Sequence, residues 1–102
     1  MSSDSPQIMA IRARYKASFN EKKQLVDKYI ERLSDKPTDK LILSELHGEL
    51  HKLAGSSGMY GYDDISCLCR KIMQEIVNDC FHEIALNLEG LSQLFGVYIK
   101  ED

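Results

Sequence analysis

The sequence predicts an all-α protein, an antiparallel up-down four-helix bundle with one short extra helix at its N-terminus. Apolar residues recur at intervals of three and four along most of the chain, which is the period of an α-helix. Only two prolines, Pro6 and Pro37, interrupt the 102 residues, and the breaks between the periodic stretches are short. Four long stretches with one apolar stripe each bury those stripes most simply when the helices pack side by side in alternating directions.

The first two periodic stretches meet near residue 18. Ser18 and Glu21 match the S-x-x-E capping pattern, in which the hydroxyl and the carboxylate each accept a hydrogen bond from an exposed backbone N–H at a helix start. A long helix is therefore expected to begin there, and residues 34–37 should end it, because proline disfavours helical geometry in the residue before it. The stripe of the short leading helix comprises Ile8, Ile11 and Tyr15. The stripe of the long helix comprises Val26, Tyr29, Ile30 and Leu33.

Three further helices complete the expected bundle. The first of them should be capped by Thr38 or Asp39 and should end between Gly58 and Gly61. The next is expected from about residue 62 to 78, with two aspartates in its first turn, where the helix dipole favours negative charge. The last runs almost to the C-terminus. The three stripes comprise Leu43, Leu46, Leu50 and Leu53, then Ile65, Leu68, Ile72 and Ile76, then Phe81, Ile84, Leu88, Leu91, Phe95 and Tyr98.

Length, charge and cysteine content bound the class of protein. With 102 residues, 43% of them hydrophobic, the chain suits one small domain over residues 1–102. Its 13 Lys and Arg against 16 Asp and Glu give a net charge of −3 without a basic stripe, so we expect no nucleic-acid partner. No apolar run approaches the roughly 20 residues that cross a membrane, and residues 1–5 lack the features of a signal peptide. Three cysteines, an odd number, indicate reduced thiols, and we expect a cytoplasmic protein.

Two groups of residues have the side-chain types of metal ligands. The first comprises Cys67, Cys69, Cys80 and His82. Because Cys67 and Cys69 are two residues apart on an expected helix, they point to nearly opposite sides, which favours helix packing over a shared metal. The second is the H-x-x-x-H pair of His47 and His51, for which Glu49 has the wrong offset and no third ligand is evident. We predict no metal site, and a metal-binding bundle using this pair stays a third alternative.

One stretch of the central helix breaks the rules of a well-packed bundle. At about 100° per residue, His51 falls on the flank of the leucine stripe and Lys52 roughly opposite it, so the imidazole should be at least partly exposed. The same flank carries Gly48, Gly55 and Gly58, although each glycine costs about 1 kcal/mol relative to alanine inside a helix. Bare backbone around a neutral, nucleophilic imidazole suits attack on a phosphoryl group brought by another protein. The alternative is an ordinary boundary histidine beside glycines that permit close helix packing.

Residues 51–65, with the sequence HKLAGSSGMYGYDDI, resemble the signature of histidine-containing phosphotransfer (Hpt) domains. The family pattern is H-x-L-x-G-S/A with a further glycine ten residues after the histidine. The matching positions are His51, Leu53, Gly55, Ser56 and Gly61, followed by Ile65 and Cys69.

The resemblance implies a phosphorelay carrier without enzymatic activity of its own. His51 would accept a phosphoryl group on Nε2 from the phosphoaspartate of a receiver domain and pass it to another receiver in two-component signalling. The partners would be receiver domains of response regulators or hybrid kinases, which themselves hold the Mg²⁺, so that this monomeric chain needs no cofactor. The alternative is a non-phosphorylated helical adaptor that binds and occludes a receiver.

The resemblance also assigns residues that support the histidine. Gly55 would permit close approach, and Gly48, Gly58 and Gly61 belong to the same glycine-lined flank. Ser56 could orient the imidazole through Nδ1, and its alternative is a hydroxyl bonded back to its own helix.

The chain departs from the family pattern at one position, where a supporting cation is usual. Many members carry a lysine three residues after the histidine, near the phosphoryl oxygens, whereas this chain has Ala54. Lys52 is the nearest candidate to replace that lysine. Arg70 and Lys71 of the following helix are further candidates, because the sequence alone does not fix which way they face.

The resemblance also implies a docking surface for the receiver. In the family, receivers bind beside the histidine through a mostly apolar patch. The apolar candidates for this patch are Ile8, Ile11, Tyr15, Met59 and Tyr60. Burial in the core is the alternative for each of them.

Overall fold

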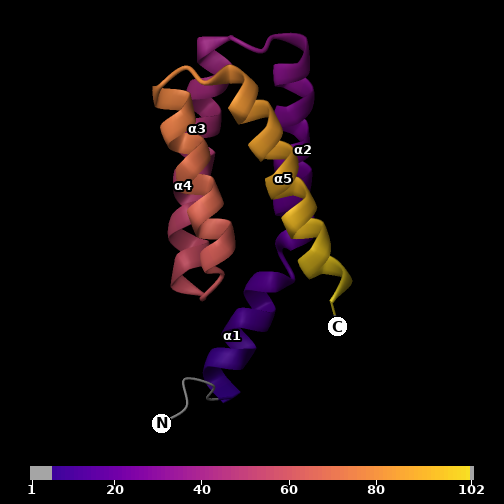
Figure 1. The fold of residues 1–102 in the computed structure, drawn as a ribbon. Coiled ribbons are helices and arrows are strands. Elements are labelled where there is room, and N and C mark those ends of the chain that lie inside the picture. Colours follow the sequence, from indigo (N-terminus) through magenta and orange to yellow (C-terminus); the bar gives the residue numbers. More distant parts are fainter. Residues whose placement is uncertain (1–5, 102) are drawn as a thin grey trace.

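The computed structural model describes residues 6–101, which form five α-helices joined by short turns (Figure 1). The helices are α1 (Pro6–Lys16), α2 (Phe19–Asp35), α3 (Lys40–Met59), α4 (Asp63–Val77) and α5 (Phe81–Lys100). Helices α2 to α5 run alternately up and down and pack together as a bundle, so the predicted all-α fold class is confirmed. Within residues 6–101, no helix is long and apolar enough to cross a membrane.

The four long helices close around one apolar core. Helix α2 lies beside α5, α3 beside α4, and α4 also packs against α5. The predicted stripes supply the core, because the leucine seam of α3 and the inward positions of the other helices are buried or half-buried. The largest fully buried side chains are Phe19, Phe95, Leu43, Leu46, Leu50, Ile65, Ile72, Ile84, Leu88, Leu91, Val26 and Cys69.

Helix α1 projects beyond the end of the bundle instead of covering it (Figure 1). None of its residues is buried, and aromatic contacts of its last turns attach it to the bundle. The ring of Tyr15 stacks on Tyr60 with centroids 4.6 Å apart, and its centroid lies 5.5 Å from that of Phe19 in an edge contact. The guanidinium of Arg12 lies 5.0 Å from the centre of the Tyr62 ring.

The junction between α1 and α2 differs from the expected capping box. Ser18 precedes α2, yet its backbone is already in the right-handed helical region and its side chain makes no cap hydrogen bond. Its hydroxyl donates instead to the carbonyl of Tyr15 at 2.5 Å and accepts from Lys22 Nζ. The predicted capping role of Ser18 is therefore wrong, because the chain passes from α1 into α2 without the extended residue that a cap requires.

The other helix ends agree with their sequence signals. The carboxylate of Asp39 caps α3 by accepting hydrogen bonds from the backbone N–H groups of Leu41 and Ile42. Gly61 follows α3 with a φ of +84°, a backbone conformation that glycine adopts without strain, and this turns the chain back into α4. At the opposite end of the bundle, Lys40 forms an ion pair with Asp79 in the turn between α4 and α5.

Candidate functional site

His51 lies in the middle of α3 with its imidazole exposed, as the helical spacing predicts. It lies between two buried leucines, Leu50 and Leu53, which fix the rotation of α3 about its axis. The imidazole borders a hollow of about 310 Å³ between α3 and α4. The side chains that line this hollow are His51, Ala54, Gly55, Arg70 and Met73. His51 is exposed as a residue, and among residues 6–101 no hydrogen bond engages either nitrogen of its ring.

The glycines near His51 divide into two groups. Gly48 and Gly55 are exposed helical positions where an added Cβ would meet no atom within 4 Å, so packing within the protein does not require glycine there. Gly58 packs against α4, because an added Cβ would lie 3.2 Å from Ser66 Oγ. Gly61 is required by its positive φ. Close helix packing, the alternative interpretation, therefore explains Gly58 and leaves Gly48 and Gly55 without an internal reason.

The hydroxyl of Ser56 points toward α1 rather than toward the imidazole. Ser56 Oγ and the Tyr15 hydroxyl lie 2.6 Å apart, and Ser56 Oγ also lies 3.4 Å from the carbonyl oxygen of Leu53 in its own helix. Burial raises the pKa of the Tyr15 hydroxyl. In this arrangement, Ser56 ties the anchor of α1 to the helix that carries His51.

The candidate cations separate onto two sides of α3. Lys52 Nζ lies 3.7 Å from Glu49 Oε2 and borders another hollow, of about 470 Å³, which side chains of α2 and α3 line. Arg70 instead borders the hollow of His51. The structure thus places Lys52, which we selected from sequence as the nearest cation, away from that hollow. The sequence alone did not fix which way Arg70 faces, because its direction depends on how α4 packs against α3.

The expected docking residues also divide. Ile8, Ile11 and Met59 are 44%, 47% and 78% exposed, as a docking patch requires. Tyr15 and Tyr60 are half-buried and stacked on each other, so for these two the packing alternative describes the main contact.

Residues 6–101 contain no group of three or more His, Cys, Asp and Glu side chains placed to hold a metal ion. The three cysteines are free thiols at different depths, since Cys67 is exposed, Cys80 half-buried and Cys69 buried. Burial raises the pKa of the Cys69 thiol to about 12, so this side chain acts as a small apolar residue of the core.

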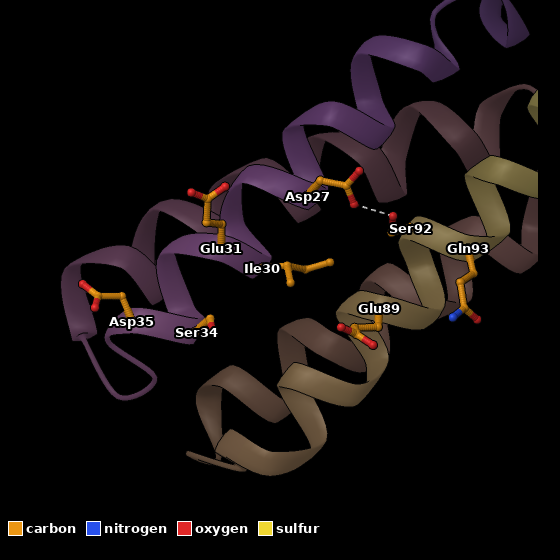
Figure 2. Close-up of a pocket in the computed structure, with 8 residues that line it drawn as sticks. All are labelled: Asp27, Ile30, Glu31, Ser34, Asp35, Glu89, Ser92 and Gln93. Carbon is orange, nitrogen blue, oxygen red and sulfur yellow. Dashed lines mark hydrogen bonds between the residues drawn. The ribbon is translucent and has the colours of Figure 1, made fainter.

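A larger hollow, of about 680 Å³, lies between α2 and α5 (Figure 2). Carboxylates line both of its sides, and Asp27 on α2 accepts a hydrogen bond from Ser92 on α5 across it (Figure 2). The acidic side chains are Asp27, Glu31, Asp35 and Glu89. No histidine lines this hollow, and its acidic side chains disfavour a bound anion.

Comparison with known families identifies the family of this chain. The family model of the Hpt domain matches residues 21–94. The chain belongs to the Hpt domain family. The match covers α3 and α4 entirely, almost all of α2 and most of α5, and it leaves out α1. No match was found among curated proteins or among solved structures. Membership gives this Hpt domain a histidine phosphotransfer role in phosphorelay signalling.

Proposed function

We propose that His51 of this Hpt domain accepts a phosphoryl group from the phosphoaspartate of one receiver domain and passes it to the aspartate of another. The observation that carries the proposal is the setting of the imidazole. It is exposed in the middle of α3, and Gly48 and Gly55 flank it although nothing inside the protein requires glycine at either position. Each glycine costs about 1 kcal/mol of helix stability. A partner surface that must approach the backbone closely gives a reason for glycine at these positions despite that cost.

The transfer chemistry needs few groups from this protein. The lone pair of His51 Nε2 attacks phosphorus, the N–P bond forms, and the P–O bond to the donor aspartate breaks. The electron pair of that bond leaves on the aspartate carboxylate. The positive charge that forms on the ring is removed when the Nδ1 proton is released to solvent, and the phosphoryl group keeps its negative charge. Passing the group to a second receiver reverses these steps on another carboxylate. Phosphoryl transfer of this kind depends mainly on positioning and on stabilising charge.

The receiver supplies the remaining parts in this proposal. Its Mg²⁺ neutralises the transferring group, so the chain acts as a carrier without a cofactor and without autonomous catalysis. The receivers belong to response regulators or hybrid kinases, and the carrier works as a monomer. Its three cysteines are free thiols, which supports a place in the reducing cytoplasm.

The apolar outer face of α1 supports a receiver-docking surface. We define the docking patch as Ile8, Ile11 and Met59, the exposed members of the predicted set. It lies toward the end of the bundle where α3 finishes, on the C-terminal side of His51 in that helix. An apolar patch beside a transfer site lets a receiver bind without covering its own phosphorylated aspartate.

The test is transfer from a panel of phosphorylated receiver domains to the wild-type chain and to His51→Gln. We expect label on the wild type alone, and the label should be stable in base and labile in acid, as phosphohistidine is. Binding of a receiver by both proteins without label on either would contradict the carrier and establish the occluding adaptor instead.

A further inference from the structure

We infer that Arg70 supplies the cation that holds the phosphoryl oxygens on His51, in the role that the side chain at position 54 does not fill. The inference rests on the proposed function and adds a second functional residue, on α4, to it.

The shared hollow brings Arg70 and His51 to one surface. Both border the same space of about 310 Å³, together with Ala54, Gly55 and Met73. Ala54 and Gly55 contribute little or no side-chain volume, so the space beside the imidazole stays open. A phosphoryl group on the ring has room there between α3 and α4.

The register of the two helices explains why Arg70 stands at the level of His51. Ser66 Oγ on α4 donates to the carbonyl oxygen of Ala54 on α3 at 2.8 Å. Because the helices are antiparallel, four residues forward from Ser66, about 6 Å, and three residues back from Ala54, about 4.5 Å, lead in the same direction. Residues four apart share a helix face, so Arg70 follows Ser66 on the face toward α3.

The guanidinium of Arg70 is available for an anion. Arg70 is exposed, and within residues 6–101 no ion pair or hydrogen bond engages its side chain. An arginine presents several N–H donors in a planar fork that matches the oxygens of a phosphoryl group. The side chain can thus bind the phosphoryl oxygens without first breaking another contact.

The neighbouring lysines do not reach the same space. Lys52 pairs with Glu49 and borders the hollow on the opposite flank of α3. Lys71 is exposed and follows Arg70 directly, about 100° further around α4, and it does not border the hollow of His51. Lys71 is therefore a matched control for Arg70, with the same charge, the same helix and similar exposure.

The experiment uses phosphoramidate as a small phosphodonor, so that no receiver contributes its own cations. In this reaction the P–N bond of phosphoramidate breaks, ammonia leaves, and the N–P bond to His51 Nε2 forms. The initial rate of phosphohistidine formation is measured for wild type, Arg70→Gln, Arg70→Lys, Lys71→Gln and His51→Gln, after circular dichroism has shown equal unfolding temperatures.

We expect Arg70→Gln to react about tenfold more slowly than wild type, the effect of one charge-assisted hydrogen bond. Arg70→Lys should fall between the two, because it keeps the charge and loses the fork, and Lys71→Gln should match wild type. Equal rates for Arg70→Gln and Lys71→Gln, or an Arg70→Lys rate as low as that of Arg70→Gln, overturn the role of Arg70 while leaving His51 as the acceptor. Absence of label on the wild type overturns the proposed function and this inference together.

Discussion

The hydroxyl of Tyr15 on α1 lies 2.6 Å from Ser56 Oγ on α3, five residues after His51. This contact and the stacking of Tyr15 on Tyr60 join the projecting helix to the helix that carries His51, the proposed phosphoacceptor. The pair thus fixes where the docking patch stands relative to His51.

Tyr15→Phe removes the hydroxyl and keeps the ring stack, and Ser56→Ala removes the other partner. Each substitution should lower the free energy of unfolding by about 1 kcal/mol, since a half-buried hydrogen bond is lost. Urea unfolding of both single variants and of the double variant measures their coupling. The double variant should be less stable than the less stable single variant by only a few tenths of a kcal/mol. Fully additive losses would show that the two hydroxyls do not act as a pair.

Ile8→Asp and Ile11→Asp should each weaken transfer from a receiver without lowering stability. Both side chains are about half exposed, at 44% and 47%, and neither belongs to the core, so a charge there costs little in the free protein. A receiver that buries one of them loses about 1 to 2 kcal/mol of binding, roughly a tenfold change in affinity. Titration of receiver binding measures this change.

Leu41→Asp is the control for the docking patch. Leu41 is 72% exposed and lies at the start of α3, at the other end of the bundle. It should leave receiver affinity unchanged. If Leu41→Asp weakened binding as much as Ile8→Asp does, the docking patch would not be the specific contact of the receiver.

Gly48→Ala and Gly55→Ala should stabilise the protein and impair transfer. An added Cβ meets no atom within 4 Å at either position, and alanine is favoured over glycine inside a helix by about 1 kcal/mol. The same methyl group would stand in the path of an approaching receiver. Thermal unfolding and transfer kinetics should therefore move in opposite directions.

Gly90→Ala is the matched control for these glycines. Gly90 lies on α5, and an added Cβ there also meets no atom within 4 Å. This substitution should raise stability by a similar amount and leave the transfer rate as it is. A loss of transfer in Gly90→Ala would mean that stiffening the bundle, and not a steric block beside His51, slows the reaction.

Ser92→Ala should make stability less dependent on pH in the acid range. Burial acts to raise the pKa of Asp27, but hydrogen bonds from Ser92 and Lys23 outweigh it, so the pKa of this carboxyl lies below its usual value. A depressed carboxyl pKa contributes stability above the unfolded-state value of about 4, and this contribution is lost as the pH falls through the folded-state pKa. Wild type and Ser92→Ala should thus differ at pH 7 and converge near pH 2, as urea unfolding at several pH values measures. A difference that stays constant over this range would assign the loss to packing.

The stripes predicted the bundle because apolar spacing alone determines which face of each helix is buried. Leu43, Leu46, Leu50 and Leu53 form such a stripe, and their burial also places His51 at the surface. This reasoning treats one helix at a time and needs no information about the helices that pack against it.

Features that depend on two helices were beyond that reasoning. Whether Arg70 faces α3 depends on how α4 packs against α3, at the contact between Ser66 and Ala54. The sequence does not specify this contact. The capping pattern at Ser18 is a local signal. It fails because the chain turns continuously from α1 into α2. Glycine occurs in helices for several structural reasons, so only the structure separates the packing role of Gly58 from the open backbone at Gly55.

The projection of α1 leaves its exposed side chains free of any role in filling the core. Its outer face contributes nothing to the core, and the match to the Hpt family model begins after it, at residue 21. Side chains there can change at little cost in folding stability, while the helices around His51 keep their packing. If a receiver docks on α1 as proposed, substitutions at exposed positions of this one helix can change which receiver binds without disturbing the core.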